Sequence, residues 1–176
     1  MIGMTFTNGS PLVAPTRSTK AALGTNPLAV VAPGLPSTGP FYLDVSMATV
    51  ALGKIEMCKR SGTKLERGWA LGPDGKETLD PDTAINGGSL LPLGGSEKTA
   101  GYKGFGLAAF VDMLSGVLAG AKYGHHVPRW SPTAKNTADI GQTFIAINHK
   151  CFAHSFEVRV SDCIEYWRKL KPVCIL

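Results

Sequence analysis

The sequence has few cysteines, and their spacing argues against two common kinds of small protein. No C-x-x-C pair occurs, and no spacing is typical of a disulfide framework, among Cys58, Cys151, Cys163 and Cys174. The four histidines form no i, i+4 pair with a glutamate between and complete no cysteine or aspartate pattern typical of a metal site. We therefore expect reduced thiols, as in the cytoplasm, and no structural metal.

Several other motifs are missing, and each absence excludes a class of protein. No G-x-S-x-G motif marks a serine nucleophile. The P-loop fails as well, because Lys98-Thr99 follows Glu97 where that motif requires glycine. The N-terminus has neither the basic start nor the long apolar run of a signal peptide. The longest apolar stretch is too short, and with Asp112 too polar, for a membrane span.

The charge of the chain does not indicate a nucleic-acid partner. The formal net charge is +5, but lysines and arginines are spread along the sequence and alternate with acidic residues. With 176 residues and 44% hydrophobic composition, the chain is long enough to bury one sizeable core. We therefore expect a single globular domain over residues 1–176, without nucleic acid or membrane as a partner.

Hydrophobic patterning predicts alternating strands and helices. Apolar runs bounded by proline and glycine indicate strands, and helical spacing of apolar residues indicates helices, the middle one apolar around nearly its whole circumference and so buried. Turn signals fill residues 61–99, which predicts a long functional loop. The fold class expected is α/β, with a mixed β-sheet and packed helices. The strands are expected at residues 1–7, 28–32, 41–43 and 142–147, and the helices at 47–60, 103–121 and from 156 to about 171.

A glycine-rich stretch at residues 104–109 fits the relaxed dinucleotide spelling G-x-G-x-x-A, but its context fails. A strand should run directly into the glycines, and here a loop precedes them. Close helix packing explains the small residues more simply, and they lie at Gly104, Gly106, Ala108 and Ala109.

Two charged residues have more than one interpretation. Lys103 stands at the start of an expected apolar helix, where free N–H groups favour an anion, but it also fits as a solvated loop lysine. Asp44 lies at a strand-to-helix junction, where it is either a helix N-cap or part of a ligand crevice. Spacing alone favours the structural interpretation of both.

Six phrases, in order along almost the whole chain, resemble the non-Rossmann malate/L-lactate dehydrogenase family. They are MIGMTFTNGSPLVAPTRS, AALGTNPLAVVAP, FYLDVSMATVALGKIE, GWALGPDGKETLDPDTA, GGSLLPLGGSEKTAGYKGFGLAAFVDMLSGVLAGA and DIGQTFIAIN. The resemblance implies a non-Rossmann cofactor-binding core and an oxidoreductase that interconverts a 2-hydroxyacid, malate-like or lactate-like, and its 2-oxoacid by hydride transfer. It also implies NAD or NADP as cofactor and a homodimer in the full-length family.

The resemblance also implies which residues of this sequence contact the cofactor. The strand end with Asp44, Val45 and Ser46 matches a stretch that contacts the dinucleotide, although Val45 replaces the usual methionine. Lys103, beside Tyr102, matches the lysine of the family's Y-K-G or P-K-G turn. Gly9 lies in a third loop near the cofactor, at a position often occupied by Thr or Ser.

The resemblance does not extend to the family's catalytic residues. Family members carry an N-terminal segment with an acid/base histidine and a substrate-binding arginine, and a further C-terminal segment, and this chain matches neither. None of the four histidines matches the catalytic ones, so no catalytic residue is assigned. We expect a fragment or short isoform with little activity alone, or alternatively a non-catalytic truncated isoform that associates with the full-length enzyme.

Overall fold

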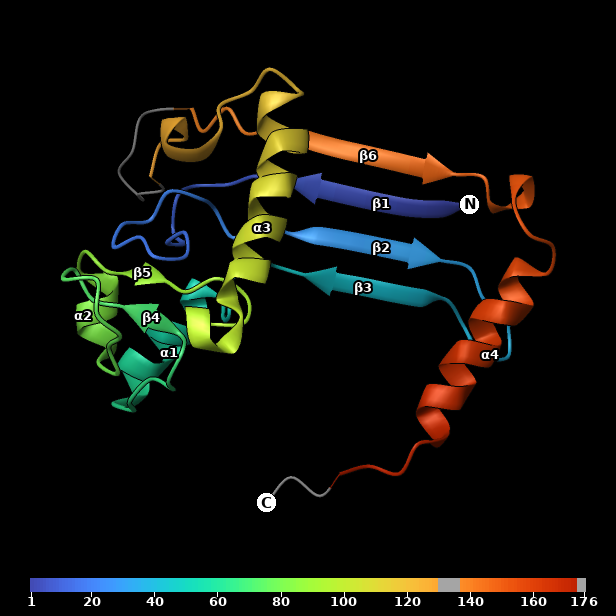
Figure 1. The fold of residues 1–176 in the computed structure, drawn as a ribbon, viewed down its shortest axis with the longest axis horizontal. Coiled ribbons are helices and arrows are strands. Elements are labelled where there is room, and N and C mark those ends of the chain that lie inside the picture. Colours follow the sequence, from blue (N-terminus) through green and yellow to red (C-terminus); the bar gives the residue numbers. More distant parts are fainter. Residues whose placement is uncertain (130–136, 174–176) are drawn as a thin grey trace. The chain divides into compact units, whose positions relative to one another are not determined.

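The computed structural model describes residues 1–129 and 137–173. Its main sheet has the strand order β3-β2-β1-β6, and its small second sheet pairs β4 with β5. Figure 1 shows that neighbouring strands of the main sheet run in opposite directions. The strands are β1 (Ile2–Thr7), β2 (Leu28–Ala32), β3 (Phe41–Val45), β4 (Ala70–Leu71), β5 (Ser89–Leu90) and β6 (Gln142–Ile147).

Four α-helices accompany the sheets in the described residues: α1 (Leu52–Ser61), α2 (Pro81–Ile85), α3 (Gly101–Asp112) and α4 (Phe156–Lys169). The predicted α/β class is confirmed, and so are the four long strands and the last helix. A Rossmann fold needs parallel neighbouring strands joined by helical crossovers. The alternating strand directions in the main sheet therefore agree with a non-Rossmann core.

The first predicted helix begins later than the apolar spacing suggested. Residues 47–50 are not helical and consist of bends and an isolated β-bridge, and α1 begins at Leu52 after an extended Ala51. Hydrogen bonds to distant residues take the place of helical ones here, because Met47 N–H donates to the Thr25 carbonyl oxygen and Thr49 N–H donates to the Leu91 carbonyl oxygen. Asp44 is therefore not the N-cap of a helix, and that structural interpretation was wrong.

The second predicted helix is shorter, and less buried, than expected. The α-helix ends at Asp112, and Met113–Val117 continues as a π-helical turn. The prediction of a helix buried on all sides was wrong, because a run of large apolar side chains remains exposed on it. These side chains are Leu107, Phe110, Met113, Val117 and Leu118.

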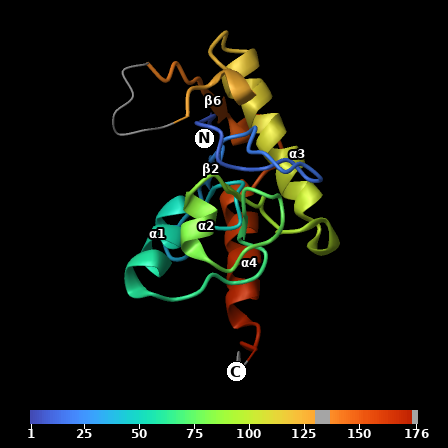
Figure 2. The same cartoon turned by 90° about the vertical axis from the view of Figure 1, so that its left-hand side faces the viewer.

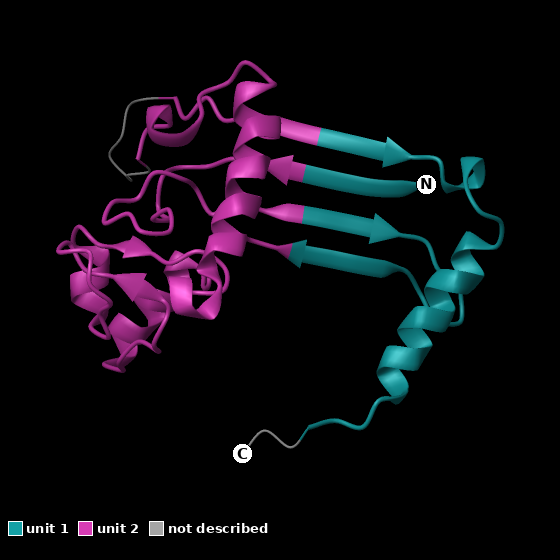
Figure 3. Ribbon diagram, viewed as in Figure 1, with its two compact units in different colours: residues 1–5, 29–44, 144–176 teal, residues 6–28, 45–143 magenta. Residues whose placement is uncertain are grey.

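The chain divides into two compact units, shown in Figure 3. Unit 1 holds residues 1–5, 29–44 and those from 144 onward, and unit 2 holds residues 6–28 and 45–143. Each strand of the main sheet contributes residues to both units. In unit 2, α1 and α2 lie side by side (Figure 2) and are joined by an ion pair of 2.5 Å between Lys59 and Asp82.

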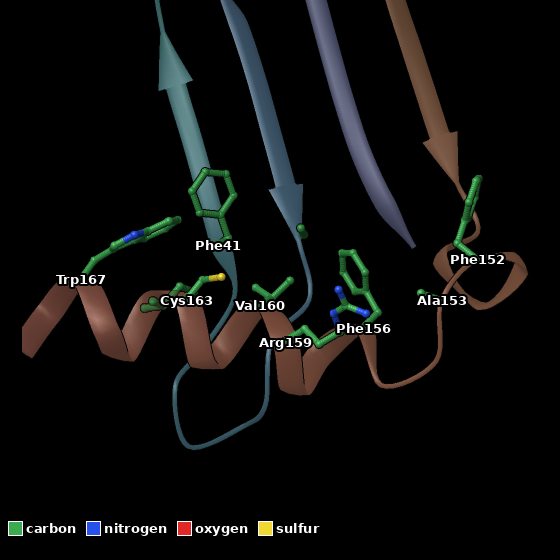
Figure 4. A pocket seen from close by; sticks show the side chains of 10 residues that line it. Phe41, Phe152, Ala153, Phe156, Arg159, Val160, Cys163 and Trp167 are labelled. Atoms are coloured by element: carbon green, nitrogen blue, oxygen red, sulfur yellow. The ribbon is translucent and has the colours of Figure 1, made fainter.

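In unit 1, polar contacts fix α4 to the connection between β2 and β3. The buried Ser161 hydroxyl accepts a hydrogen bond from Leu35 N–H at 2.8 Å, and Thr38 donates to Glu165 at 3.0 Å. The predicted apolar face of α4 lines a groove of about 460 Å³ (Figure 4), which is also lined by Phe41 of β3 and by Phe152 of the segment before α4. The face consists of Phe156, Val160, Cys163, Ile164 and Trp167.

Two glycines of the 104–109 stretch differ in their surroundings, so the packing interpretation holds for only one of them. A Cβ at Gly104 would lie 2.2 Å from the Leu93 carbonyl oxygen, whereas a Cβ at Gly106 would meet nothing within 4 Å. Gly104 and Ala108 are buried, which confirms close packing there. Gly106 is exposed, and packing does not explain it.

We predict opposite effects for Gly104→Ala and Gly106→Ala. The first forces a methyl group against backbone and lowers the free energy of unfolding by about 1–3 kcal/mol. The second improves helix propensity and raises it by about 0.4–1 kcal/mol. Urea unfolding followed by circular dichroism measures both. Equal losses for the two variants would contradict the packing of Gly104 against Leu93.

Candidate functional site

The segment after β3 is held in place by hydrogen bonds to its neighbours in unit 2. Met47 is 1% exposed, and its carbonyl oxygen accepts a hydrogen bond of 3.0 Å from Leu93 N–H. Thr49 bonds to the same loop, because its hydroxyl donates to the Pro92 carbonyl oxygen at 2.8 Å. Residues 45–49 and 91–93 therefore form one continuous backbone layer.

The start of α3 packs against this layer without side chains between. Gly104 lies directly against the Leu93 backbone, and a Cβ at Gly101 would overlap the Gly95 carbonyl oxygen. Ala100, just before the helix, takes a left-handed conformation with φ of 69°. Because only glycine allows such close backbone approach, the Y-K-G turn is fixed against the 91–95 loop.

A small apolar cluster joins the strand end to α3. Its buried members are Leu23, Met47 and Ala108, and Val45 and Phe105 pack against them. Val45, which replaces the methionine usual at this position, contributes to this contact with its smaller side chain. The cluster holds the backbone of residues 45–47 beside the first turns of α3.

Asn26 ties the Gly9 loop to the same helix. Its side chain is fully buried, its Oδ1 accepts from Gly9 N–H at 3.2 Å, and its Nδ2 donates to the Ala108 carbonyl oxygen at 2.8 Å. A Cβ at Gly9 would meet nothing within 4 Å, so the missing Thr or Ser side chain leaves open space there.

Unit 2 thus brings together five of the six residues predicted for the cofactor. Gly9, Val45 and Ser46 are half-buried, and Tyr102 and Lys103 are exposed at the start of α3. All five lie on segments joined through Asn26, Leu93 and the apolar cluster. The sixth, Asp44, is an exposed residue of β3 and belongs to unit 1.

Sequence reasoning missed a pocket of about 420 Å³ that joins the two main segments in unit 2. Thr49 contributes from the strand end, and residues 94–96, 98 and 99 contribute from the loop before α3. Two cations, Arg67 and Lys98, and one carboxylate, Glu77, also line it. The sequence offered one weak signal, the lysine and threonine of the failed P-loop.

An exposed ion pair orients the loop beside this pocket. The Arg17 guanidinium donates three hydrogen bonds to the Glu97 carboxylate, with lengths of 2.5–3.0 Å. These hydrogen bonds are the main cause of the lowered pKa of Glu97, and the charge of Arg17 adds to the effect. The carboxylate next to Lys98 is therefore occupied by Arg17 and does not line the pocket.

The histidines do not form a catalytic or metal-binding group in the described residues. His125 and His126 are exposed, and their rings lie 4.0 Å apart. His149 is buried, stacks on Phe156 and lies 3.4 Å from Glu157. Across residues 1–129 and 137–173, no three His, Cys, Asp or Glu side chains gather as metal ligands.

In the same described residues, no helix is long and apolar enough to cross a membrane.

Comparison with known families agrees with this arrangement. The family model for malate/L-lactate dehydrogenase matches residues 1–174. The chain belongs to this family. It is 41% identical to malate dehydrogenase of Pyrococcus abyssi over 167 residues, and the match covers 93% of this chain and 45% of that protein.

Solved structures of relatives have the same fold. Sulfolactate dehydrogenase from Methanocaldococcus jannaschii matches with a TM-score of 0.85 and 35% identity, over 98% of this chain and 48% of that one. Malate dehydrogenase from Pyrococcus horikoshii matches with a TM-score of 0.81 and 35% identity, over 99% and 46%. The chain therefore spans about half the length of the relatives it matches.

We predict that Asn26→Ala lowers the free energy of unfolding by about 2–3 kcal/mol, because it removes two hydrogen bonds, one from the half-buried Gly9 N–H and one to the buried Ala108 carbonyl oxygen. The exposed Asn86→Ala variant is the matched control and stays within about 0.5 kcal/mol of the parent. Urea titration compares the two. Similar values for both variants would exclude a role for Asn26 in joining the Gly9 loop to α3.

We also predict that Arg17→Ala raises the pKa of Glu97 toward its ordinary value of 4.5, because the hydrogen bonds to the charged carboxylate are lost. A lowered pKa means that the ion pair is intact above the ordinary value and is lost as the pH falls through the lowered one. Carboxyl NMR titration reads this directly. The pKa of Asp80, lowered mainly by its hydrogen bond from Thr83, serves as the unchanged reference.

Proposed function

We propose that this chain provides the NAD(P)-binding part of an oxidoreductase that interconverts a 2-hydroxyacid and its 2-oxoacid. The observation that carries the proposal is the convergence, in unit 2, of the strand end at residues 45–49 and the Y-K-G turn on the backbone of Leu93. The family match supports the reaction class, because its relatives bear the names malate and sulfolactate dehydrogenase.

The residues at this convergence suit a dinucleotide. Lys103 stands in the first turn of α3, where a cation and the positive end of the helix dipole together attract phosphate. Ser46 supplies a half-buried hydroxyl on the neighbouring segment, and Tyr102 supplies an exposed aromatic ring. Gly9 leaves room for close approach of the ligand. Asp44, the unit 1 residue directly before Val45 in the chain, is proposed as a cofactor contact on the resemblance alone.

The cofactor supplies the hydride, whereas the protein must supply a proton donor and a cation for the substrate carboxylate. None of the four histidines matches the family's acid/base histidine: His149 belongs to unit 1 and contacts Glu157, and His125 and His126 contact each other. We therefore propose that the 176-residue chain binds cofactor but has little turnover, and that the family's homodimer supplies the complete enzyme. A cytoplasmic location is part of the same proposal.

The expected result for the purified chain is saturable binding of reduced dinucleotide, read from an increase in nicotinamide fluorescence, without measurable oxidation of malate or lactate. Lys103→Gln weakens binding about tenfold, because one charge-assisted contact to phosphate is lost. Lys20→Gln, a change at an exposed lysine that is not among the residues proposed to contact the cofactor, leaves binding unchanged. Absence of binding by the parent chain, or equal binding by both variants, contradicts the proposal.

The exposed apolar side chains of α3 and the π-helical turn after it support a second candidate, a non-catalytic isoform that associates with a full-length family member. Leu118 is 74% exposed and Met113 is 60% exposed, and three more large apolar side chains between residues 107 and 117 are exposed as well. Monomeric soluble proteins rarely expose large contiguous apolar patches.

Association is tested by sedimentation of the chain mixed with a full-length family member. The expected result under the second candidate is a mixed complex that Leu118→Lys disrupts, whereas Glu66→Lys, at an exposed position of the same unit, leaves it intact. A chain that sediments as a monomer in the mixture excludes this candidate.

A further inference from the structure

We infer that the pocket beside the Y-K-G turn binds the adenosine 2′-phosphate of NADP, so that the chain selects NADP over NAD. The inference rests on the proposed function and adds the choice between the two cofactors. It is carried by the pocket of about 420 Å³ that Thr49, Lys98 and Arg67 line in unit 2. A pocket of this size accommodates one half of a dinucleotide.

The position of the pocket connects it to both proposed cofactor segments. Thr49 ends the segment that begins with Val45 and Ser46, and its hydroxyl donates to the Pro92 carbonyl oxygen at 2.8 Å. On the opposite wall, residues 94–99 lead within a few positions to Tyr102 and Lys103. A dinucleotide that contacts both segments can therefore also reach this pocket, because the pocket is lined by the end of one segment and by the residues just before the other.

The floor of the pocket is built from glycine backbone. Gly68, Gly94 and Gly95 all have positive φ angles, of 81°, 96° and 78°. A Cβ on Gly95 would lie 3.1 Å from the Thr99 hydroxyl and 3.4 Å from the Gly68 carbonyl oxygen, so the two glycine turns face each other closely. Such a floor admits a flat base or ribose against the main chain.

The charges at the pocket favour a phosphate. Arg67 and Lys98 form no ion pair with any acidic residue in the described ranges, and both are exposed. Glu97, which separates Ser96 from Lys98, is held by Arg17. The hydroxyls of Ser96 and Thr99, 3.2 Å apart, add further hydrogen-bonding groups.

One group in the pocket would favour NAD instead. Sites for NAD commonly use a carboxylate on the ribose 2′-hydroxyl, whereas sites for NADP use a cation on the 2′-phosphate. Glu77 is such a carboxylate, but its Oε1 already accepts a hydrogen bond of 2.7 Å from Gly68 N–H. The pocket therefore has two cations without ion-pair partners among the described residues, Arg67 and Lys98, and one carboxylate, Glu77, that is already bonded to the pocket's backbone. This excess of positive charge favours the phosphate.

The test measures the dissociation constants of NADPH and NADH for the 176-residue chain by nicotinamide fluorescence. We expect NADPH to bind at least about tenfold more tightly than NADH, as one charge-assisted contact provides. Lys98→Gln and Arg67→Gln should each weaken NADPH binding about tenfold and leave NADH binding unchanged. Unchanged NADH binding also shows that the variants fold. Lys20→Gln is the matched control, with neither affinity changed. Adenosine 2′,5′-bisphosphate should displace NADPH, and adenosine 5′-phosphate should displace it poorly.

Two results overturn the inference while the proposed function stands. The first is tighter binding of NADH that Glu77→Gln weakens, which would mean that the carboxylate binds the ribose. The second is equal binding of both dinucleotides with no effect of Lys98→Gln or Arg67→Gln. If neither dinucleotide binds to the parent chain, the proposed function fails, and the inference fails with it.

Discussion

The peptide of Leu93 is the contact on which the candidate site depends. On one side its N–H donates to the Met47 carbonyl oxygen, and on the other its backbone lies directly against Gly104. These contacts set the distance between the strand end and α3 with main chain alone. The position of the Y-K-G turn therefore does not depend on flexible side chains. Asn26 extends the same arrangement to the Gly9 loop through two hydrogen bonds to backbone groups.

The backbone contacts of Leu93 also fix the segment that carries two lysines of unit 2. Lys103 stands in the first turn of α3, and Lys98 lies on the loop before it. No Asp or Glu lies between these two lysines, at residues 99–102. Glu97, just before Lys98, is paired with Arg17. A continuous stretch of chain thus presents two cations on a loop and helix start, which is suited to an extended anionic ligand.

Much of the fold follows from local patterns in the sequence. Short apolar runs between glycine and proline located the four long strands, because such runs are buried in strands and end where those residues stop the pairing. The first helix was placed five residues too early, since Met47 and Val50 fit helical spacing while the backbone of Met47 and Thr49 is hydrogen-bonded to distant residues instead. Periodicity does not register such long-range bonds. Dependence on distant residues also explains why the pocket at Thr49 and Lys98 was missed.

The site residues are predicted from the resemblance, and spacing alone favoured a structural interpretation of Asp44 and Lys103. The structure removes one alternative, because Asp44 caps no helix. It also separates the two glycines that looked alike in the sequence, since only Gly104 faces another backbone. The difference arises from which side of α3 meets the 91–95 loop, a fact of tertiary packing that a one-dimensional motif does not contain.

The glycine floor of the pocket has a consequence for how such proteins diverge. Gly94 and Gly95 hold positive φ angles that other residues rarely adopt, so their replacement disturbs the backbone that also positions α3. Lys98 and Arg67 are exposed side chains, and their replacement does not require a change of backbone conformation. Over evolutionary time the shape of the pocket should persist while its charge varies, and a lineage can exchange one phosphate-bearing ligand for another by one or two surface substitutions.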